Sequence, residues 1–116
     1  MELEGHEGEV TAVSALADGR AITVSDDCTA RVWDLSRGTC EMVLEGHGGR
    51  VEAVSALADG RAITGSYDKT ARVWDLSLGA CEMVLRGHEC SLNAVSALAD
   101  GRVITTCLDG TAKVWK

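Results

Sequence analysis

A six-residue stretch that contains a tryptophan recurs three times along this chain. It reads TARVWD at residues 29–34 and again at 70–75, and TAKVWK at 111–116. The three tryptophans, and the three Gly-His pairs that precede them, all recur at a step of 41 residues. A fixed step of this length is typical of proteins in which each repeat is one small unit that buries its core only by stacking on its neighbours.

The chain divides into two full repeats and a shorter third one, within a single domain of residues 1–116. The first repeat covers residues 5–45 and the second 46–86, and they differ at nine positions; the third covers residues 87–116. Residues 1–4 align with residues 42–45, the end of the first repeat. We therefore expect the chain to begin with the last part of a strand that has no repeat before it.

Each full repeat contains four short β-prone runs divided by turn signals. In the second repeat the runs are 51–57, 62–66, 70–74 and 80–85, and no segment is long enough for a convincing helix. The Asp-Gly pair between the first two runs favours a type I′ hairpin, which needs positive φ at both central residues. A four-stranded sheet cannot bury both faces alone, so we predict an all-β protein with three four-stranded antiparallel sheets stacked face to face.

The motifs and their order resemble WD40 repeats. They are Gly-His at the start of each repeat, Asp-Gly in the first hairpin, Ser-x-Asp-x-Thr after the second strand and Val-Trp-Asp at the end of the third. Their period is close to the family period of about 40–45 residues. The resemblance implies a β-propeller whose blades run strands a to d from the axis outward. The chain departs from the family pattern at Lys116, where the usual aspartate is lost, and at Ala58, where proline is common.

The resemblance also implies a buried group of four side chains in each blade: a histidine, a threonine on strand b, an aspartate in the b–c turn and the tryptophan on strand c. Such side chains satisfy one another by hydrogen bonding inside the sheet. By position they are His6, Thr23, Asp27 and Trp33 in the first blade, His47, Thr64, Asp68 and Trp74 in the second, and His88, Thr105, Asp109 and Trp115 in the third.

A histidine, a carboxylate and a hydroxyl are also the parts of a hydrolase site. A catalytic site is normally solitary, whereas these residues recur in every repeat, so we prefer the structural interpretation. The three histidines, one to a blade, are too far apart to meet at about 2 Å from one zinc ion. We therefore predict no catalytic residue, no metal and no cofactor, and a hydrolase is the least favoured function.

Composition limits the partners and the location. A net charge of −7 at pH 7 leaves no basic surface for a phosphate backbone, so we expect no nucleic acid partner. No apolar run approaches the roughly 18 residues of a membrane-spanning helix, and the acidic start lacks the features of a targeting signal. This predicts a soluble, cytoplasmic protein that binds no membrane. The five cysteines show neither a disulfide framework nor metal-binding spacing, so we expect reduced thiols.

The first two repeats differ mainly beside the Gly-His pair and in the b–c turn, two loops that a propeller places on the same face. The a–b turn, ADGR, is identical in all three repeats. Variable loops on a rigid frame often form binding surfaces, which predicts a face for a protein or peptide. Drift at tolerant loops after a recent duplication explains the same pattern equally well. The candidate face comprises Glu7, Glu9, Asp26, Arg50, Tyr67, Lys69, Glu89, Asn93 and Leu108.

Three blades do not close a ring, because propellers have from about four to eight blades. We expect head-to-tail self-association, in which residues 1–4 of one chain add the missing strand d to the third blade of the next. A homodimer with six blades at about 60° each is preferred to a homotrimer with nine at about 40°. A purely structural unit with no ligand, excised or engineered from a longer propeller, is the alternative. The candidate subunit interface comprises Met1, Glu2, Leu3, Glu4, Val114, Trp115 and Lys116.

Overall fold

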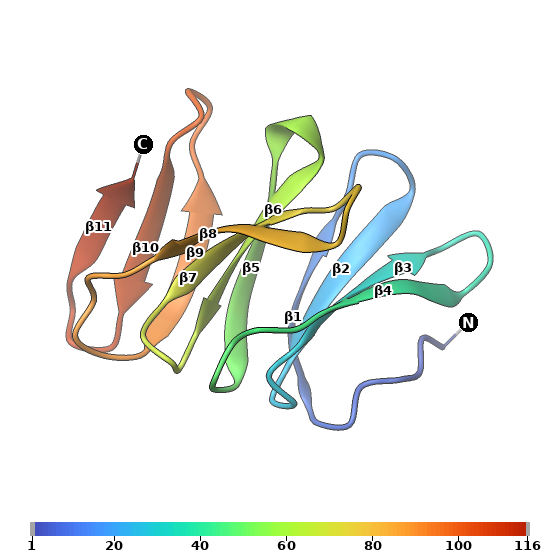
Figure 1. Cartoon of the computed structure of the whole chain (residues 1–116), viewed down its shortest axis with the longest axis horizontal. Helices are drawn as coiled ribbons and strands as arrows, with labels where there is room; N and C mark the ends of the chain where they lie inside the picture. The colour runs from blue at the N-terminus through green and yellow to red at the C-terminus, as the bar shows by residue number, and fades with distance from the viewer. Residues whose placement is uncertain (1, 116) are drawn as a thin grey trace.

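Three antiparallel sheets stand side by side in the order of the chain (Figure 1). The computed structural model describes residues 2–115. The first sheet contains β1 (Val10–Ala15), β2 (Arg20–Ser25), β3 (Ala30–Asp34) and β4 (Thr39–Leu44). The second sheet contains β5 (Val51–Leu57), β6 (Arg61–Ser66), β7 (Ala71–Asp75) and β8 (Ala80–Leu85). The third sheet contains β9 (Leu92–Ala97), β10 (Val103–Cys107) and β11 (Ala112–Trp115). A short 3₁₀ turn, η1 (Ala58–Gly60), joins β5 to β6. Within residues 2–115, no helix is long and apolar enough to cross a membrane.

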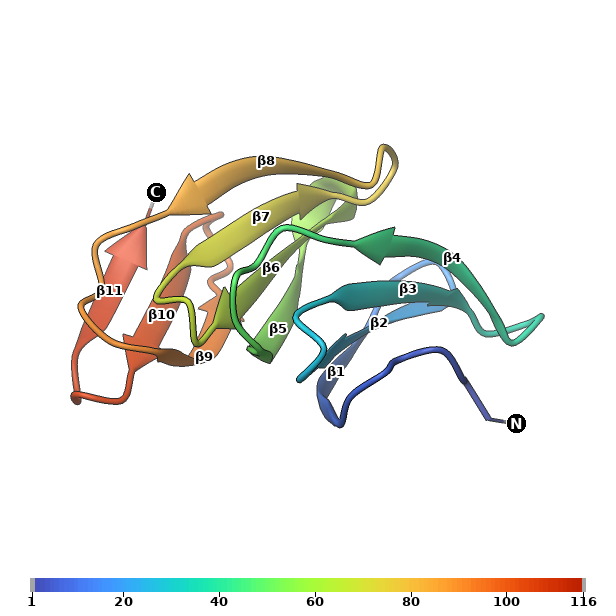
Figure 2. The ribbon, with the colours of Figure 1, turned by 60° about the horizontal axis from the view of Figure 1, so that its bottom comes forward.

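Each sheet is a meander, in which strands that follow one another in sequence also pair in space. The strands predicted at 51–57 and 80–85 are confirmed as β5 and β8, and the other two predicted in that repeat differ from β6 and β7 by one residue at their ends. Strand β5 contacts both β1 and β9, while β4 and β8 lie at the outer edges of their sheets (Figure 2). The predicted stack of antiparallel sheets is confirmed, but among the described residues the third sheet has three strands and not four.

The Asp-Gly turns between strands a and b share one sequence but adopt two conformations. Asp59 and Gly60 both have positive φ, 65° and 72°, as the predicted type I′ turn requires. In the a–b turn of the first repeat only Gly19 has positive φ, and Asp18 instead binds Arg20, with 2.8 Å between Oδ2 and Nε. The third repeat follows the first, with the same ion pair at the same distance. The type I′ prediction is therefore wrong for these two turns.

The core lies in two layers, one between each pair of neighbouring sheets. We call the side of a sheet that carries its tryptophan the front face, and the opposite side the back face. In the first layer Val32, on the back face of the first sheet, shares a cluster with Trp74 on the front face of the second. In the second layer Val73 occupies the same place on the second sheet and shares a cluster with Leu92 and Val103 of the third. Each layer therefore joins a back face to a front face.

The front face of the first sheet and the back face of the third form the two ends of the stack. Val10 is 50% exposed on the first sheet, whereas its repeat equivalents Val51 and Leu92 are fully buried. Val114 is 52% exposed on the third sheet, whereas its equivalent Val73 is 4% exposed. The same repeat positions are therefore buried wherever a neighbouring blade is present and exposed where none is.

Candidate functional site

In the second blade the four predicted side chains form one hydrogen-bonded chain. Trp74 Nε1 donates to Thr64 Oγ1 over 2.9 Å, the Thr64 hydroxyl donates to His47 Nε2 over 2.7 Å, and His47 Nδ1 donates to Asp68 Oδ2 over 2.8 Å. These residues lie on β7, on β6, in the loop before β5 and in the β6–β7 turn. One network therefore joins four segments of the blade, in surroundings where Trp74, Thr64 and His47 are each less than a tenth exposed.

The order of donors and acceptors determines the protonation of His47. The ionised Asp68 can only accept, so the imidazole carries its proton on Nδ1 and offers Nε2 to the Thr64 hydroxyl. A second proton on Nε2 would face an oxygen that already accepts from Trp74, and the hydroxyl hydrogen would lose its acceptor. Burial lowers the pKa of His47, although the hydrogen bond to Asp68 and its charge oppose this. The ring is therefore neutral at pH 7.

Asp68 also holds the loop and the turn together. Its Oδ1 accepts from the backbone N–H and the hydroxyl of Thr70, over 2.9 and 2.6 Å, and its Oδ2 accepts from the backbone N–H of Gly48 over 2.9 Å. Burial alone would raise the pKa of Asp68, but the hydrogen bonds from Thr70, His47 and Gly48 lower it to about 2. The carboxylate is therefore ionised at neutral pH and fastens the Gly-His loop to the β6–β7 turn.

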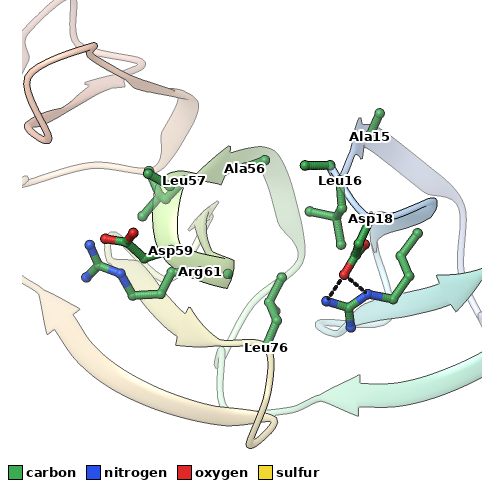
Figure 3. A pocket seen from close by; sticks show the side chains of 12 residues that line it. Ala15, Leu16, Asp18, Ala56, Leu57, Asp59, Arg61 and Leu76 are labelled. Carbon is green, nitrogen blue, oxygen red and sulfur yellow. Dashed lines mark hydrogen bonds and ion pairs between the residues drawn. The ribbon is translucent and has the colours of Figure 1, made fainter.

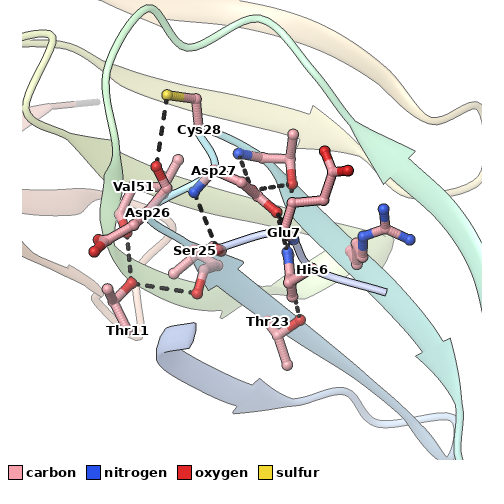
Figure 4. A network of polar contacts seen from close by, with 12 residues as sticks. His6, Glu7, Thr11, Thr23, Ser25, Asp26, Asp27, Cys28 and Val51 are labelled. Atoms are coloured by element: carbon pink, nitrogen blue, oxygen red, sulfur yellow. Dashed lines mark hydrogen bonds and ion pairs between the residues drawn. The ribbon is translucent and has the colours of Figure 1, made fainter. Parts of the chain in front are cut away.

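The first blade repeats this geometry (Figure 4). His6 contacts Asp27 over 2.9 Å and Thr23 over 2.7 Å, and Trp33 Nε1 donates to Thr23 over 2.8 Å. Burial would raise the pKa of Asp27, but hydrogen bonds from Thr29 and then His6 hold it well below its usual range. The structure thus brings all four predicted residues together in both of the first two blades.

The third blade forms two of the three hydrogen bonds of the network. Trp115 Nε1 donates to Thr105 Oγ1 over 2.9 Å, and Thr105 contacts His88 Nε2 over 2.6 Å. The Nδ1 atom of His88, however, is buried without a hydrogen-bond partner. Asp109 accepts at Oδ1 from the thiol of Cys107 over 2.7 Å. The expected bond between Asp109 and His88 is therefore not formed, and the Gly-His loop of this blade lacks its carboxylate tie.

These networks leave no threonine hydroxyl of strand b free to meet a substrate. In the first two blades the threonine hydroxyl is bonded on both sides, by the imidazole and the indole, and is less than a tenth exposed. Each imidazole also meets the edge of its tryptophan, with ring centroids 6.2 and 6.3 Å apart. A nucleophile must reach its substrate, whereas these hydroxyls serve as internal links. The arrangement suits the cross-linking of a loop, a turn and two strands.

The candidate interaction face lies at the edge where the Gly-His loops meet the b–c turns, which we call the loop edge. In Figure 1 the b–c turns lie along the lower edge of the sheets, and the a–b turns along the upper edge. Asp26 N–H donates to the Glu9 carbonyl over 2.9 Å, and Tyr67 N–H to the Arg50 carbonyl over 3.0 Å. The Arg50 guanidinium also lies 4.1 Å from the centre of the Tyr67 ring. Of the predicted residues, Asp26 and Tyr67 are half-buried, and Glu7, Glu9, Arg50, Lys69, Glu89, Asn93 and Leu108 are exposed.

The described residues of the predicted subunit interface lie at the two ends of the stack. Residues 2–9 form no strand. Val114 is exposed, whereas Trp115 is half-buried and packs against the second core layer. Of the others, Glu2 and Glu4 are exposed, Leu3 is half-buried, and Met1 and Lys116 lie outside the described residues.

An apolar groove at the opposite edge was not predicted. It lies between the a–b turns of the first two blades and has a volume of about 560 Å³ (Figure 3). Leu16, Leu57 and Leu76 line it, and the ion pair between Asp18 and Arg20 lies at its rim. The sequence signal is the leucine that precedes each Asp-Gly turn. Its lining holds no thiol, hydroxyl or imidazole, so the groove offers mainly apolar contact.

A cluster in the third blade was also missed. The ligand-type atoms of Cys90, Cys107 and Asp109 all lie within 4.8 Å of one another. The two cysteines are 17 positions apart and belong to no repeated cysteine pattern, so they looked scattered. The sequence signal is the repeat alignment, in which both positions change to cysteine in the same repeat. Their equivalents Gly49 and Ser66 are in contact, since the Ser66 hydroxyl donates to the Gly49 carbonyl over 3.0 Å.

Known proteins show where this architecture occurs. The family model described as WD domain, G-beta repeat (WD40), matches residues 1–34, 38–75 and 79–116. A search of curated protein sequences found no match. The crystal structure of the WD40 beta propeller domain of Doa1 is similar, with a TM-score of 0.90 and 23% sequence identity over 96% of this chain and 38% of that one. This chain therefore spans well under half of that solved chain. The chain belongs to the WD40 repeat family.

Proposed function

We propose that this chain is a non-catalytic cytoplasmic scaffold that associates head to tail with copies of itself and offers its loop edge to a protein or peptide. WD40 propellers are generally non-catalytic and typically mediate protein interactions. That property supports the general part of the proposal. The head-to-tail association rests on one observation: apolar repeat positions that are buried between neighbouring blades are exposed at the two ends of the stack.

The two open faces match the two halves of an interface that the chain already forms twice. On the front face of the first sheet Val13 is 65% exposed, while its equivalents Val54 and Val95 pack against the preceding blade. On the back face of the third sheet Val114 is 52% exposed, while its equivalent Val73 is 4% exposed. A second copy with its front face on Val114 would repeat the existing contact and remove apolar surface from water.

Backbone pairing supports the same arrangement. Strand β11 lies at the edge of its sheet, whereas β3 and β7 pair on their outer sides with β4 and β8. Unpaired edges readily accept another strand. Residues 2–4 align with residues 43–45, and within that segment Val43 and Leu44 pair with β3. We therefore place residues 2–4 of one copy beside β11 of the next, in a homodimer with six blades, with the nine-bladed homotrimer as the alternative.

Light scattering in solution on the 116-residue chain tests the assembly. We expect the mass of two 12.2 kDa chains. Three chains would select the nine-bladed ring, and a stable monomer would refute self-association. The Val13→Asp and Val114→Asp variants each place a charge on one open face, so each should be monomeric. Leu78→Asp is the matched control, because Leu78 is 77% exposed in the β7–β8 turn, away from both faces.

A mixture of the two variants tests the head-to-tail geometry itself. The Val13→Asp chain keeps an intact back face, and the Val114→Asp chain keeps an intact front face. Equal amounts should therefore form a pair through the one remaining intact interface, because a heterologous contact uses two different surfaces. If the mixture stayed monomeric while the unmodified chain formed dimers, the contact would not be head to tail.

The loop edge has the residue types expected of a binding surface. The Arg50 guanidinium stacks on the Tyr67 ring, and Lys69 is exposed in the same blade. Tyrosine and arginine are enriched in the energetically important parts of interfaces. We propose that a peptide or protein contacts this edge.

Selection from a random-peptide display library tests this part. Enriched peptides should bind the triple variant Arg50→Ala, Tyr67→Ala, Lys69→Ala about tenfold more weakly, a loss of about 1.4 kcal/mol. Arg102→Ala, on the opposite edge, is the control and should bind as the original chain does. Equal binding to the triple variant would exclude this edge, and a selection that enriches no peptide would favour the purely structural unit.

A further inference from the structure

Cys90 and Cys107 lie side by side at the loop edge of the third blade. Cys90 belongs to the loop before β9, Cys107 ends β10, and their Sγ atoms are 2.6 Å apart. A disulfide bond is about 2.05 Å long, whereas two thiolates bound to one tetrahedral zinc at about 2.3 Å would lie roughly 3.8 Å apart. The observed separation is closer to that of bonded sulfur atoms than to that of two zinc ligands.

The repeats provide an internal comparison for this pair. The positions of Cys90 and Cys107 hold glycine and serine in both other repeats, and both change to cysteine in the same one. In the second blade the Ser66 hydroxyl bonds the Gly49 carbonyl over 3.0 Å, so these positions are in contact even without cysteine. A Cβ atom on Gly49 would lie 3.1 Å from the Asp68 nitrogen. A side chain is therefore crowded there, unless the loop changes.

The corresponding loop of the third blade makes different contacts. In the second blade the Asp68 N–H donates to the Ser66 hydroxyl over 3.0 Å. In the third blade the Asp109 N–H donates instead to Cys90 Sγ over 3.2 Å. The imidazole Nδ1 of His88 is left buried and unpaired. The third Gly-His loop has thus lost the carboxylate tie of the other blades and gained a contact between two sulfur atoms.

We propose that Cys90 and Cys107 form a reversible disulfide that joins the third Gly-His loop to the end of β10. The oxidant is a low-molecular-weight disulfide of the glutathione class. Cys90 is half-buried and Cys107 is 3% exposed, so Cys90 is the sulfur that the oxidant reaches first. Cys90 directly follows Glu89 and Cys107 directly precedes Leu108, and both of these neighbours belong to the candidate face. The oxidation state of the pair would therefore also affect that face.

The chemistry is ordinary thiol–disulfide exchange. The Cys90 thiolate attacks one sulfur of the small disulfide and expels the other as a thiolate. The sulfur of Cys107, after losing its proton, attacks Cys90 Sγ and expels the second small thiolate. The two leaving thiolates take up the two protons, so the protein loses two electrons and two protons while one small disulfide becomes two small thiols. The contact with Cys107, and then burial, raise the pKa of the Cys90 thiol, so exchange should be faster above neutral pH.

Intact mass spectrometry on the full chain, after incubation with oxidised glutathione in metal-free buffer and alkylation of free thiols, tests the proposal. Two of the five thiols should resist alkylation, the protein should lose the mass of two hydrogen atoms, and digestion should yield one peptide pair linked through Cys90 and Cys107. Dithiothreitol should restore all five thiols. A bond between other cysteines, or five thiols that all remain free, would overturn the proposal. Five free thiols together with stoichiometric binding of added zinc would identify a metal site instead.

Two variants keep the test interpretable, because each restores the residue found in the other repeats. Cys107→Ser should hold one glutathione on Cys90, since the second thiol is missing, and Cys90→Gly should form no disulfide. Cys40→Ser, at a position outside the pair, should oxidise as the original chain does. Circular dichroism confirms that each variant is folded. If Cys107→Ser lost the mass of two hydrogen atoms as readily as the original chain, Cys107 would not be the partner of Cys90.

Discussion

Replacing Thr64 with valine tests how much the buried network of the second blade stabilises the fold. Valine has nearly the same shape, so packing is retained and only the hydroxyl is lost. Trp74 Nε1 then loses its acceptor at 2.9 Å, and His47 Nε2 loses its donor at 2.7 Å. A buried polar atom left without a partner costs about 1–3 kcal/mol. With two such atoms, we expect the free energy of unfolding to fall by roughly 2–6 kcal/mol.

Urea unfolding followed by far-ultraviolet circular dichroism measures this loss. Protein concentration must be fixed, because the proposed self-association would make stability depend on it. The midpoint should fall while the slope stays constant, since the same surface is exposed on unfolding. Thr106→Val is the control: Thr106 donates to Asn93 at an exposed position, so its loss should be below about 0.5 kcal/mol. A folded Thr64→Val variant that loses less than about 1 kcal/mol would refute the reasoning.

Two further predictions concern acid and backbone conformation. The pKa of His47 is lowered in the folded chain, so the unfolded chain binds more protons than the folded chain as the pH falls through about 6.5. The free energy of unfolding should therefore fall as the pH falls. Urea unfolding between about pH 7.5 and 5.5 checks this, and a rise in stability would contradict it. The contribution of Asp68, with a folded pKa of about 2, should be lost only at lower pH. Lys69 has a φ of 74°, a left-handed conformation that is unfavourable for a residue with a Cβ atom, and the third repeat has Gly110 at this position. Lys69→Gly should therefore raise the free energy of unfolding by about 0.5 kcal/mol, and Gly110→Ala should lower it by about 1 kcal/mol. The same measurement checks this pair, and a loss of stability in Lys69→Gly would contradict it.

Much of the fold could be predicted because the repeats restate the same information. The alternation of apolar residues and the position of each turn locate the strands of a blade, and the resemblance to a family relates them to one another. Two of the three buried groups then follow from the family resemblance and the repeat position, since their aspartates occupy the same place in equivalent turns. In all three turns, the threonine two residues after the aspartate supplies an N–H and a hydroxyl to the carboxylate.

The remaining features depend on three-dimensional details that a one-dimensional pattern does not contain. Identical ADGR turns differ because the aspartate either binds the nearby arginine or takes a left-handed backbone conformation. His88 and Asp109 occupy their expected positions in the sequence, yet the expected bond is absent. The side chain of Cys90 occupies a place that is crowded in the second blade, where glycine stands.

In the third blade the energy of the missing hydrogen bond can be compared with that of the proposed disulfide. Loss of a hydrogen bond to a charged carboxylate typically costs about 1.5–3 kcal/mol, and the third Gly-His loop lacks the bond that the first two loops make. A disulfide that closes a loop of about 17 residues stabilises by about 3 kcal/mol in the chain-entropy description. The two magnitudes are similar, so the proposed bond would compensate for the missing tie. Two loops of the chain are then held by carboxylates at any redox state, while the third is held firmly only when oxidised.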